Sequence, residues 1–195
     1  MSNRMSEPHT QIPVQRPMRA DARRNYEKLV AAALEVFTDQ GTAASLEAVA
    51  ERAGVGIGTL YRHFPNRQAL LEAVYADEVE AMARAADDLA DRPPWDAVVD
   101  WLHQYVGFAA TKRALMDMML DADPDSDVLA TCRTALARAG DELIERAQAA
   151  GVVRPDVEFL DIVRMVGQIG VAPNADQGQK ERMLAIVLDG LRARS

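Results

Sequence analysis

The chain has 195 residues, of which 49% are hydrophobic and 27% are charged, a composition typical of a globular protein. This length suits one large or two small domains with a proper core. The single cysteine excludes an internal disulfide bond, and no apolar run approaches the roughly 18 residues that span a bilayer. We therefore expect a cytoplasmic protein without a membrane partner.

The net charge is −8, but the acidic residues are unevenly distributed. Residues 1–67 carry nine basic against seven acidic side chains, whereas residues 76–195 carry thirteen against twenty-two. Contact with a polyanion depends on the local field, because charges more than about 10 Å away are largely screened at 0.1 M salt. The acidic total is therefore compatible with nucleic-acid binding by the N-terminal part.

The first twenty residues contain three prolines and scattered polar side chains, so we expect residues 1–20 to be disordered. Arg16 and Arg19 lead into Arg23 and Arg24 and make this segment basic. It is either a solvated tail or an arm that contacts phosphates or a minor groove.

A helix is predicted from about Asp21 to Gln40, and Gly41 ends it. Its apolar side chains fall on one stripe, which is the spacing of a helix packed on a core. These residues are Tyr26, Leu29, Val30, Ala33, Leu34 and Phe37.

Residues 45–64 have the pattern of two short helices joined by a tight turn. Ser45 can cap the first helix, and Val49 and Ala50 belong to its buried stripe. Gly54 suits the left-handed residue that ends a helix.

The second helix spans roughly residues 57–64, and Pro65 stops it. Its apolar side is expected to consist of Ile57, Leu60 and Phe64. Its other side is expected to carry Gly58, Thr59, Arg62 and His63, with Tyr61 at the edge. A polar, basic helix of this width fits the major groove of DNA, whereas an ordinary hairpin within a core would not explain such a surface.

The stretch resembles the TetR family of bacterial transcriptional regulators. The matching residues are Ser45, Val49, Ala50, Ala53, Gly54, Val55, Gly58, Thr59, Leu60, Tyr61, His63, Phe64, Arg67 and Leu70. The match extends back over residues 26–41. Gly56 replaces the usual Ser and removes a side-chain cap, and Arg67 replaces the usual Lys and keeps the charge.

The resemblance implies an all-α protein with a helix-turn-helix DNA-binding domain at residues 21–75 and an effector-binding and dimerisation domain at residues 76–195. It implies a homodimeric, ligand-responsive regulator, most simply a repressor, on a palindromic operator in double-stranded DNA. Residues of suitable chemistry for reading or gripping DNA are Arg24, Ser45, Gly58, Thr59, Tyr61, Arg62, His63 and Arg67.

The fourth helix is predicted from Asn66 to about Asp91, before Pro93 and Pro94. Its length suggests a connector between the two domains. Further helices are predicted at about 95–111, 113–120, 126–150, 156–171 and 179–191.

Methionine and aromatic residues are frequent in the middle region. Such a set at helical spacing is either core or, as the family resemblance suggests, the lining of a small-molecule cavity. The candidates are Trp101, Tyr105, Phe108, Met116, Met119 and Met165.

The last two predicted helices carry apolar side chains that a lone domain could bury. The resemblance implies instead that they pair with the same helices of a second subunit. The candidate interface residues are Leu160, Val163, Val166, Ile169, Leu184, Val187 and Leu191.

No cofactor, metal or catalytic site is expected. The alternating acidic residues from Asp121 to Asp127 resemble a calcium loop, but Ser126 and Cys132 stand where that loop needs Gly and Glu. His103 is expected to be a structural histidine. The rival functions are a helical module that sequesters a ligand without binding DNA, and an enzyme with titratable groups in the C-terminal cavity.

Overall fold

The computed structural model describes residues 12, 14, 16, 17, 19–119 and 126–193. That part of the chain forms eight α-helices and one short 3-10 helix, and this confirms the predicted all-α fold. The elements are α1 (Ala20–Gln40), η1 (Gly41–Ala43), α2 (Leu46–Ala53), α3 (Ile57–His63), α4 (Arg67–Asp88), α5 (Pro94–Met118), α6 (Asp127–Ala149), α7 (Phe159–Gly170) and α8 (Gln177–Leu191).

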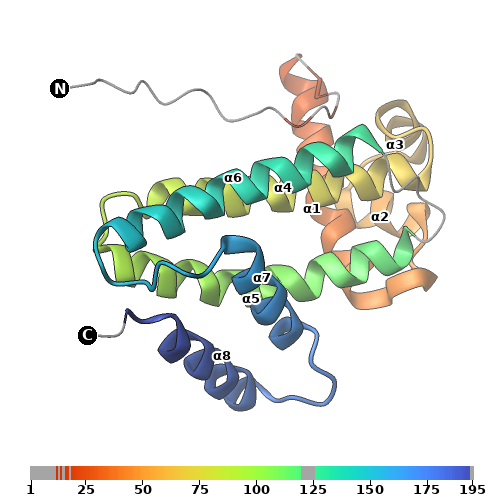
Figure 1. Cartoon of the computed structure of the whole chain (residues 1–195). Helices are drawn as coiled ribbons and strands as arrows, with labels where there is room; N and C mark the ends of the chain where they lie inside the picture. Colours follow the sequence, from red (N-terminus) through yellow and green to blue (C-terminus); the bar gives the residue numbers. More distant parts are fainter. Residues whose placement is uncertain (1–11, 13, 15, 18, 120–125, 194–195) are drawn as a thin grey trace.

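Helices α1, α2 and α3 gather at one end of the molecule (Figure 1). The predicted stripe of α1 faces their common core: Tyr26, Leu29 and Phe37 are buried to at least 96%. Leu60 of α3 and Val49 of α2 are fully buried beneath them. The small domain is therefore held by one apolar side of each helix, and the opposite side of α3 remains free.

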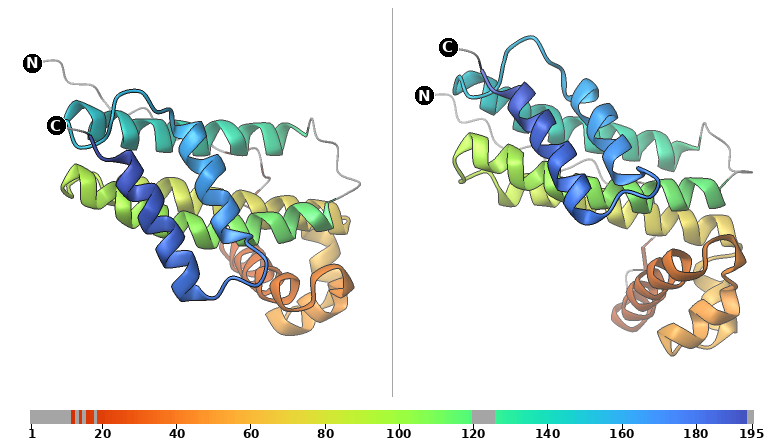
Figure 2. Two further views of the ribbon diagram at one scale, coloured as in Figure 1. Left: turned by 60° about the horizontal axis from the view of Figure 1, so that its bottom comes forward. Right: turned by 90° about the horizontal axis from the view of Figure 1, so that it is seen from below.

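Helix α4 connects this small domain to the larger one. It begins directly after α3, where the Asn66 side chain accepts a hydrogen bond from the Ala69 amide at 2.8 Å. It then runs alongside α5 and α6 (Figures 1 and 2). Buried residues such as Leu70 and Val79 line it on both sides of the predicted domain boundary. A continuous helix thus joins the two domains.

Several predicted boundaries were wrong. The segment predicted as two helices at 95–111 and 113–120 is the single helix α5, because the intervening residues contain neither Gly nor Pro and Leu115 continues the buried side. Helix α7 begins at Phe159 rather than Asp156, whose carboxylate binds the Arg154 guanidinium at 2.6 Å in the preceding turn. Helix α8 begins at Gln177, two residues before the predicted start at Gln179, because the Asp176 side chain caps it.

Helices α7 and α8 cover the outer side of α5 (Figure 2). The contact between α5 and α7 is close: a Cβ added to Gly170 would lie 2.3 Å from the Val106 carbonyl oxygen. The C-terminal end of α8 is joined to the segment between α6 and α7 by a hydrogen bond from the Arg154 amide to the Leu191 oxygen at 3.0 Å. The Arg192 guanidinium also lies 4.1 Å from the centre of the Trp95 ring.

Part of the predicted N-terminal arm packs on the protein, although Arg19 is exposed. Ile12 is 95% buried, and Arg16 donates to Glu80 of α4 at 2.7 Å and lies 3.6 Å from Asp77. The Arg16 charge is thus paired with carboxylates, although a phosphate-contacting arm was one of the two expectations. Residues 1–11, 13, 15 and 18 of that arm, and the acidic run from Asp121 to Asp125, lie outside the described residues.

Candidate nucleic-acid interface and effector pocket

The turn between α2 and α3 has the geometry predicted from the sequence. The Ser45 hydroxyl accepts a hydrogen bond from the Ala48 amide at 3.1 Å and caps α2. Gly54 adopts the left-handed conformation (φ 63°), which a side chain would strain. The Val55 amide then donates to the Ala50 oxygen at 2.9 Å, so the turn is closed by backbone hydrogen bonds.

One side of α3 is exposed. Tyr61 is 47% exposed, and Gly58 and Arg62 are also exposed, whereas Leu60 beneath them is fully buried. A Cβ added to Gly58 would meet nothing within 4 Å, so a second molecule can approach the backbone there. We call Gly58, Tyr61 and Arg62 the α3 face. Ile57, the first residue of α3, is 38% exposed and not part of the core, so the expectation that it belongs to the buried apolar side was wrong.

Other predicted DNA residues have partners within the chain. His63 is half-buried, with its ring 6.3 Å from that of Tyr26 and 6.2 Å from that of Phe64. Arg24 is exposed and pairs with Asp21 one turn away. Thr59 is half-buried beside the α3 face. Exposed groups of this kind remain available to a phosphate, since a surface ion pair contributes only about 0–1 kcal/mol.

Arg67 is placed differently from the expectation that it grips DNA. Its guanidinium donates to the backbone oxygens of Ala44 and Gly41, the latter at 3.4 Å. It also lies over the Phe37 ring, 4.9 Å from the ring centre. Burial lowers the pKa of Arg67 from its ordinary value. The structure thus gives this side chain an internal role in holding η1 against α4.

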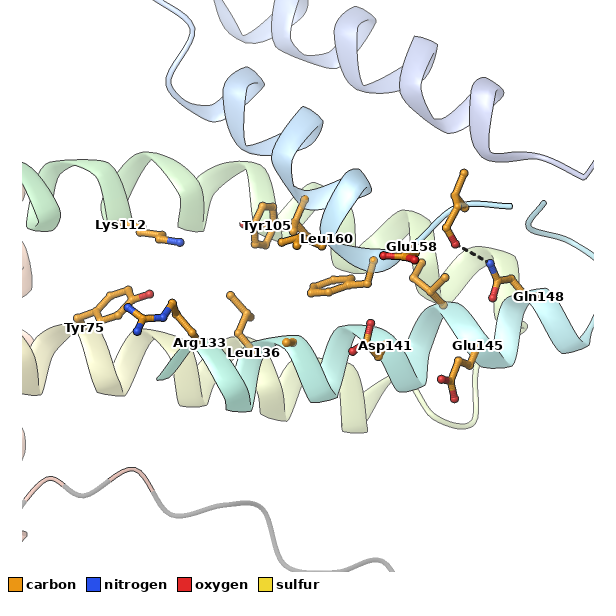
Figure 3. A pocket seen from close by; sticks show the side chains of 15 residues that line it. Tyr75, Tyr105, Lys112, Arg133, Leu136, Asp141, Glu145, Gln148, Glu158 and Leu160 are labelled. Atoms are coloured by element: carbon orange, nitrogen blue, oxygen red, sulfur yellow. Dashed lines mark hydrogen bonds between the residues drawn. The ribbon is translucent and has the colours of Figure 1, made fainter. Parts of the chain in front are cut away.

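A pocket of about 630 Å³ lies in the larger domain between α5, α6 and α7 (Figure 3). This volume is within the usual range for small-molecule sites, about 300–1,000 Å³. Its apolar wall is formed by Leu136, Phe159 and Val163. Polar groups stand at its two ends, with Lys112 and Arg133 at one and Asp141, Glu145 and Glu158 at the other.

Most of the residues proposed for an effector cavity lie elsewhere. Of the six candidates, Tyr105 alone lines this pocket. Trp101 is fully buried, with its ring nitrogen donating to the Met82 oxygen at 3.0 Å, and Phe108 stacks on Tyr75. Met116 and Met119 pack on the core, and Met165 is 49% exposed on α7. Five of the six candidates are therefore buried or packed on the core, and their role in binding an effector stays a prediction.

The proposed dimer residues divide into two groups. Those in the first group are at least 92% buried within the chain itself: Val163, Val166, Ile169, Leu184 and Leu191. Val187 is half-buried. Leu160 is 50% exposed and is joined by Met165 and by Ile186, which is 73% exposed. The exposed apolar surface of α7 and α8 thus consists of Leu160, Met165 and Ile186, two of which were not among the candidates.

Sequence reasoning missed the polar residues of the pocket. On helices α5 and α6, Lys112, Arg133 and Asp141 have the spacing of ordinary solvent-facing residues. Tyr75 was also missed, and it is 98% buried on α4 while facing the pocket. Its position after a run of apolar residues was the one available signal, because a buried tyrosine usually needs a partner for its hydroxyl.

Two family models of known proteins match the chain, one in each domain. Residues 29–74 match the family model of bacterial regulatory proteins of the tetR family, and residues 93–193 match the C-terminal domain of SbtR-like transcriptional regulators. The chain belongs to the TetR family of transcriptional regulators. It is thus a DNA-binding regulator with an N-terminal helix-turn-helix.

Individual TetR-family proteins are similar over most of their length. The crystal structure of the regulator SCO0520 from Streptomyces coelicolor has 35% identity and a TM-score of 0.74, covering 87% of this chain and 99% of that one. The regulator UidR from Escherichia coli K12 is 25% identical over 90% of this chain and 93% of its own. The repressor KstR from Rhodococcus jostii is 28% identical over 65% of this chain and 59% of its own.

The matched proteins are transcriptional regulators. Within the described residues, no helix is long and apolar enough to cross a membrane.

Proposed function

We propose that this TetR-family protein is a ligand-responsive repressor that binds a palindromic operator as a homodimer and leaves it when a small molecule occupies the C-terminal pocket. The observation that supports DNA binding most directly is the α3 face. Its backbone is open at Gly58, and Arg62 can pair with a phosphate or with a guanine edge through two hydrogen bonds.

Exposed apolar side chains on α7 and α8 support a dimer. Leu160, Met165 and Ile186 are at least 49% exposed, and these two helices form an outer layer of the larger domain (Figure 2). A twofold contact through this layer would bury all three on both subunits. Two α3 helices would then meet successive major grooves about 34–36 Å apart, and the operator would be an inverted repeat.

Helix α4 supports the coupling between pocket and DNA. It begins next to α3, and Tyr75 on the same helix faces the pocket. A ligand that contacts Tyr75 therefore touches the element that positions α3. A coupling free energy of about 1–3 kcal/mol is enough to change operator occupancy many-fold.

The experiment is selection of bound duplexes from fragmented genomic DNA of the source organism, followed by fluorescence anisotropy on the enriched sequence. We expect an inverted repeat and tight binding at moderate salt. Arg62→Ala should weaken binding, whereas Arg84→Ala, which removes an exposed arginine from α4, should leave it unchanged. No enrichment of any duplex would instead favour a helical module that does not bind DNA.

A further inference from the structure

The pocket between α5, α6 and α7 has two ends of opposite charge. At the basic end, Lys112 of α5 and Arg133 of α6 stand beside Tyr75 (Figure 3). At the acidic end, Asp141 of α6 lies near Glu158, which precedes α7, and Glu145 follows one turn further along α6. Like charges thus gather at each end and are not neutralised by each other across the pocket.

No anionic partner of the basic end is found in the part of the chain that the structure describes. Among the residues that the structure describes, Lys112 and Arg133 form no ion pair. Burial lowers the pKa of Lys112, and the neighbouring Arg133 charge adds to this effect. An anion bound here would relieve both the repulsion and the loss of hydration.

Tyr75 supplies an uncharged donor at the same end. Its side chain is 98% buried, and its hydroxyl has no hydrogen-bond partner within the described ranges 19–119 and 126–193. Burial raises the pKa of Tyr75 well above its ordinary value, so the hydroxyl keeps its proton at neutral pH. A protonated phenol beside two cations suits an oxygen anion such as a carboxylate.

The acidic end of the pocket favours a cation. Burial raises the pKa of Asp141, and the nearby carboxylates of Glu145 and Glu158 raise it further. A cationic group placed between them would stabilise all three ionised carboxylates. The side-chain amide of Gln148, at the edge of this end, already donates a hydrogen bond to the Val157 oxygen at 2.9 Å.

The separation of the two ends follows from α6. Arg133 and Asp141 are eight positions apart in this helix, which corresponds to about 12 Å along its axis. Between them, the pocket is lined by the apolar side chains of Leu136, Phe159 and Val163 and by the Tyr105 ring. The space between the charges therefore favours an apolar body.

We propose that the effector is an elongated zwitterion, with a carboxylate-type anion at Lys112, Arg133 and Tyr75 and an amine-type cation at Asp141, Glu145 and Glu158. This inference rests on the proposed function in taking the pocket as the effector site. A body of about 10–12 Å between the charged groups matches the helical rise between the two ends. The anion then lies nearer to the DNA-binding domain, against α4.

The test measures binding to the purified full-length protein by calorimetry, without DNA. The probes are ω-amino carboxylates of increasing chain length, with monocarboxylates and alkyl amines of matched length. We expect the amino carboxylates to bind best, with an optimum at the length that spans the two ends, and each single-charge analogue to bind at least tenfold more weakly. Equal binding of amino carboxylates and monocarboxylates, or no binding of any probe, would overturn the proposal.

Charge-reversed variants give a readout that a structural defect would not. The double variant Lys112→Glu with Arg133→Glu makes both ends acidic, so its preference should change from amino carboxylates to diamines. Asp141→Lys with Glu158→Lys should change the preference to dicarboxylates. Tyr75→Phe should weaken carboxylate binding roughly tenfold, since it removes one hydrogen bond to a charged group. Arg84→Glu, outside the pocket, is the control and should keep the original preference.

Failure of this inference is separable from failure of the proposed function. If the protein binds its operator but none of the probes, the effector chemistry is wrong and the regulator assignment stands. If the probes bind as expected but do not change operator affinity, the pocket chemistry stands and ligand-responsive repression is refuted.

Discussion

The guanidinium of Arg67 lies 4.9 Å from the centre of the Phe37 ring and donates hydrogen bonds to two backbone oxygens, those of Ala44 and Gly41. One side chain at the start of α4 therefore fastens the end of α1 and the η1 turn. Arg67 was among the residues predicted to grip DNA, and these contacts give it a structural role within the chain.

Arg67→Ala should lower the free energy of unfolding by about 1–3 kcal/mol, because it removes hydrogen bonds and a cation–π contact. Arg67→Lys should recover only part of this loss, since an ammonium lacks the planar fork that reaches both carbonyls. Chemical denaturation measures the effect, with Arg62→Ala as an exposed control of unchanged stability. Normal stability of Arg67→Ala combined with weak operator binding would restore the DNA-contact assignment.

The role of Arg62 can be divided between phosphate and base contact by varying salt and sequence. If Arg62 pairs with a phosphate, Arg62→Ala should weaken all duplexes alike and reduce the salt slope by about 1. If it binds a guanine edge, the loss should be about 1–3 kcal/mol and confined to operators that keep that guanine. Anisotropy titrations at several salt concentrations distinguish the two. Unchanged affinity in both series would remove Arg62 from the interface.

Local signals made the helix-turn-helix predictable. Ser45, Gly54 and Asn66 each act within one turn of their own position, so their caps follow from sequence alone. The pocket was not predictable in this way. Lys112 and Asp141 come together only through the packing of α5, α6 and α7, and each has the spacing of a solvated residue. Large apolar residues such as Trp101 marked burial correctly but gave no information on where a cavity would lie.

Dimer formation should depend on Ile186, which is 73% exposed on α8. Ile186→Glu would bury a charge in the proposed interface while leaving the chain's own core intact. We expect a folded monomer by light scattering, with unchanged helicity and weakened operator binding. Asp189→Ala, at an exposed position on the same helix, serves as the control. Persistence of a dimer in Ile186→Glu would place the interface elsewhere.

The close packing of α5 on α7 predicts opposite effects of alanine at two glycines. A Cβ at Gly170 would lie 2.3 Å from the Val106 backbone oxygen, so Gly170→Ala should separate the helices and cost about 1–3 kcal/mol. Gly107, next to Val106 in α5, is exposed and has nothing within 4 Å of such a Cβ. Gly107→Ala should therefore stabilise the protein by about 0.5–1 kcal/mol through helix propensity. Thermal denaturation measures whether each variant gains or loses stability. Equal destabilisation of the protein by both substitutions would contradict the close packing of α5 on α7.

Cys132 should be unreactive in the folded protein. Its side chain is fully buried in α6, and burial, together with the carboxylates of Glu80 and Glu72, raises the pKa of its thiol to about 12. Because the thiolate is the nucleophile, almost none is present at neutral pH, and its fraction grows only as the pH approaches that value. Iodoacetamide should modify Cys132 at the rate of unfolding, measured by mass spectrometry with the denatured chain as the reference. Rapid alkylation of the native protein at pH 7 would show that α4 and α6 separate readily at this point, which the buried contact between them argues against.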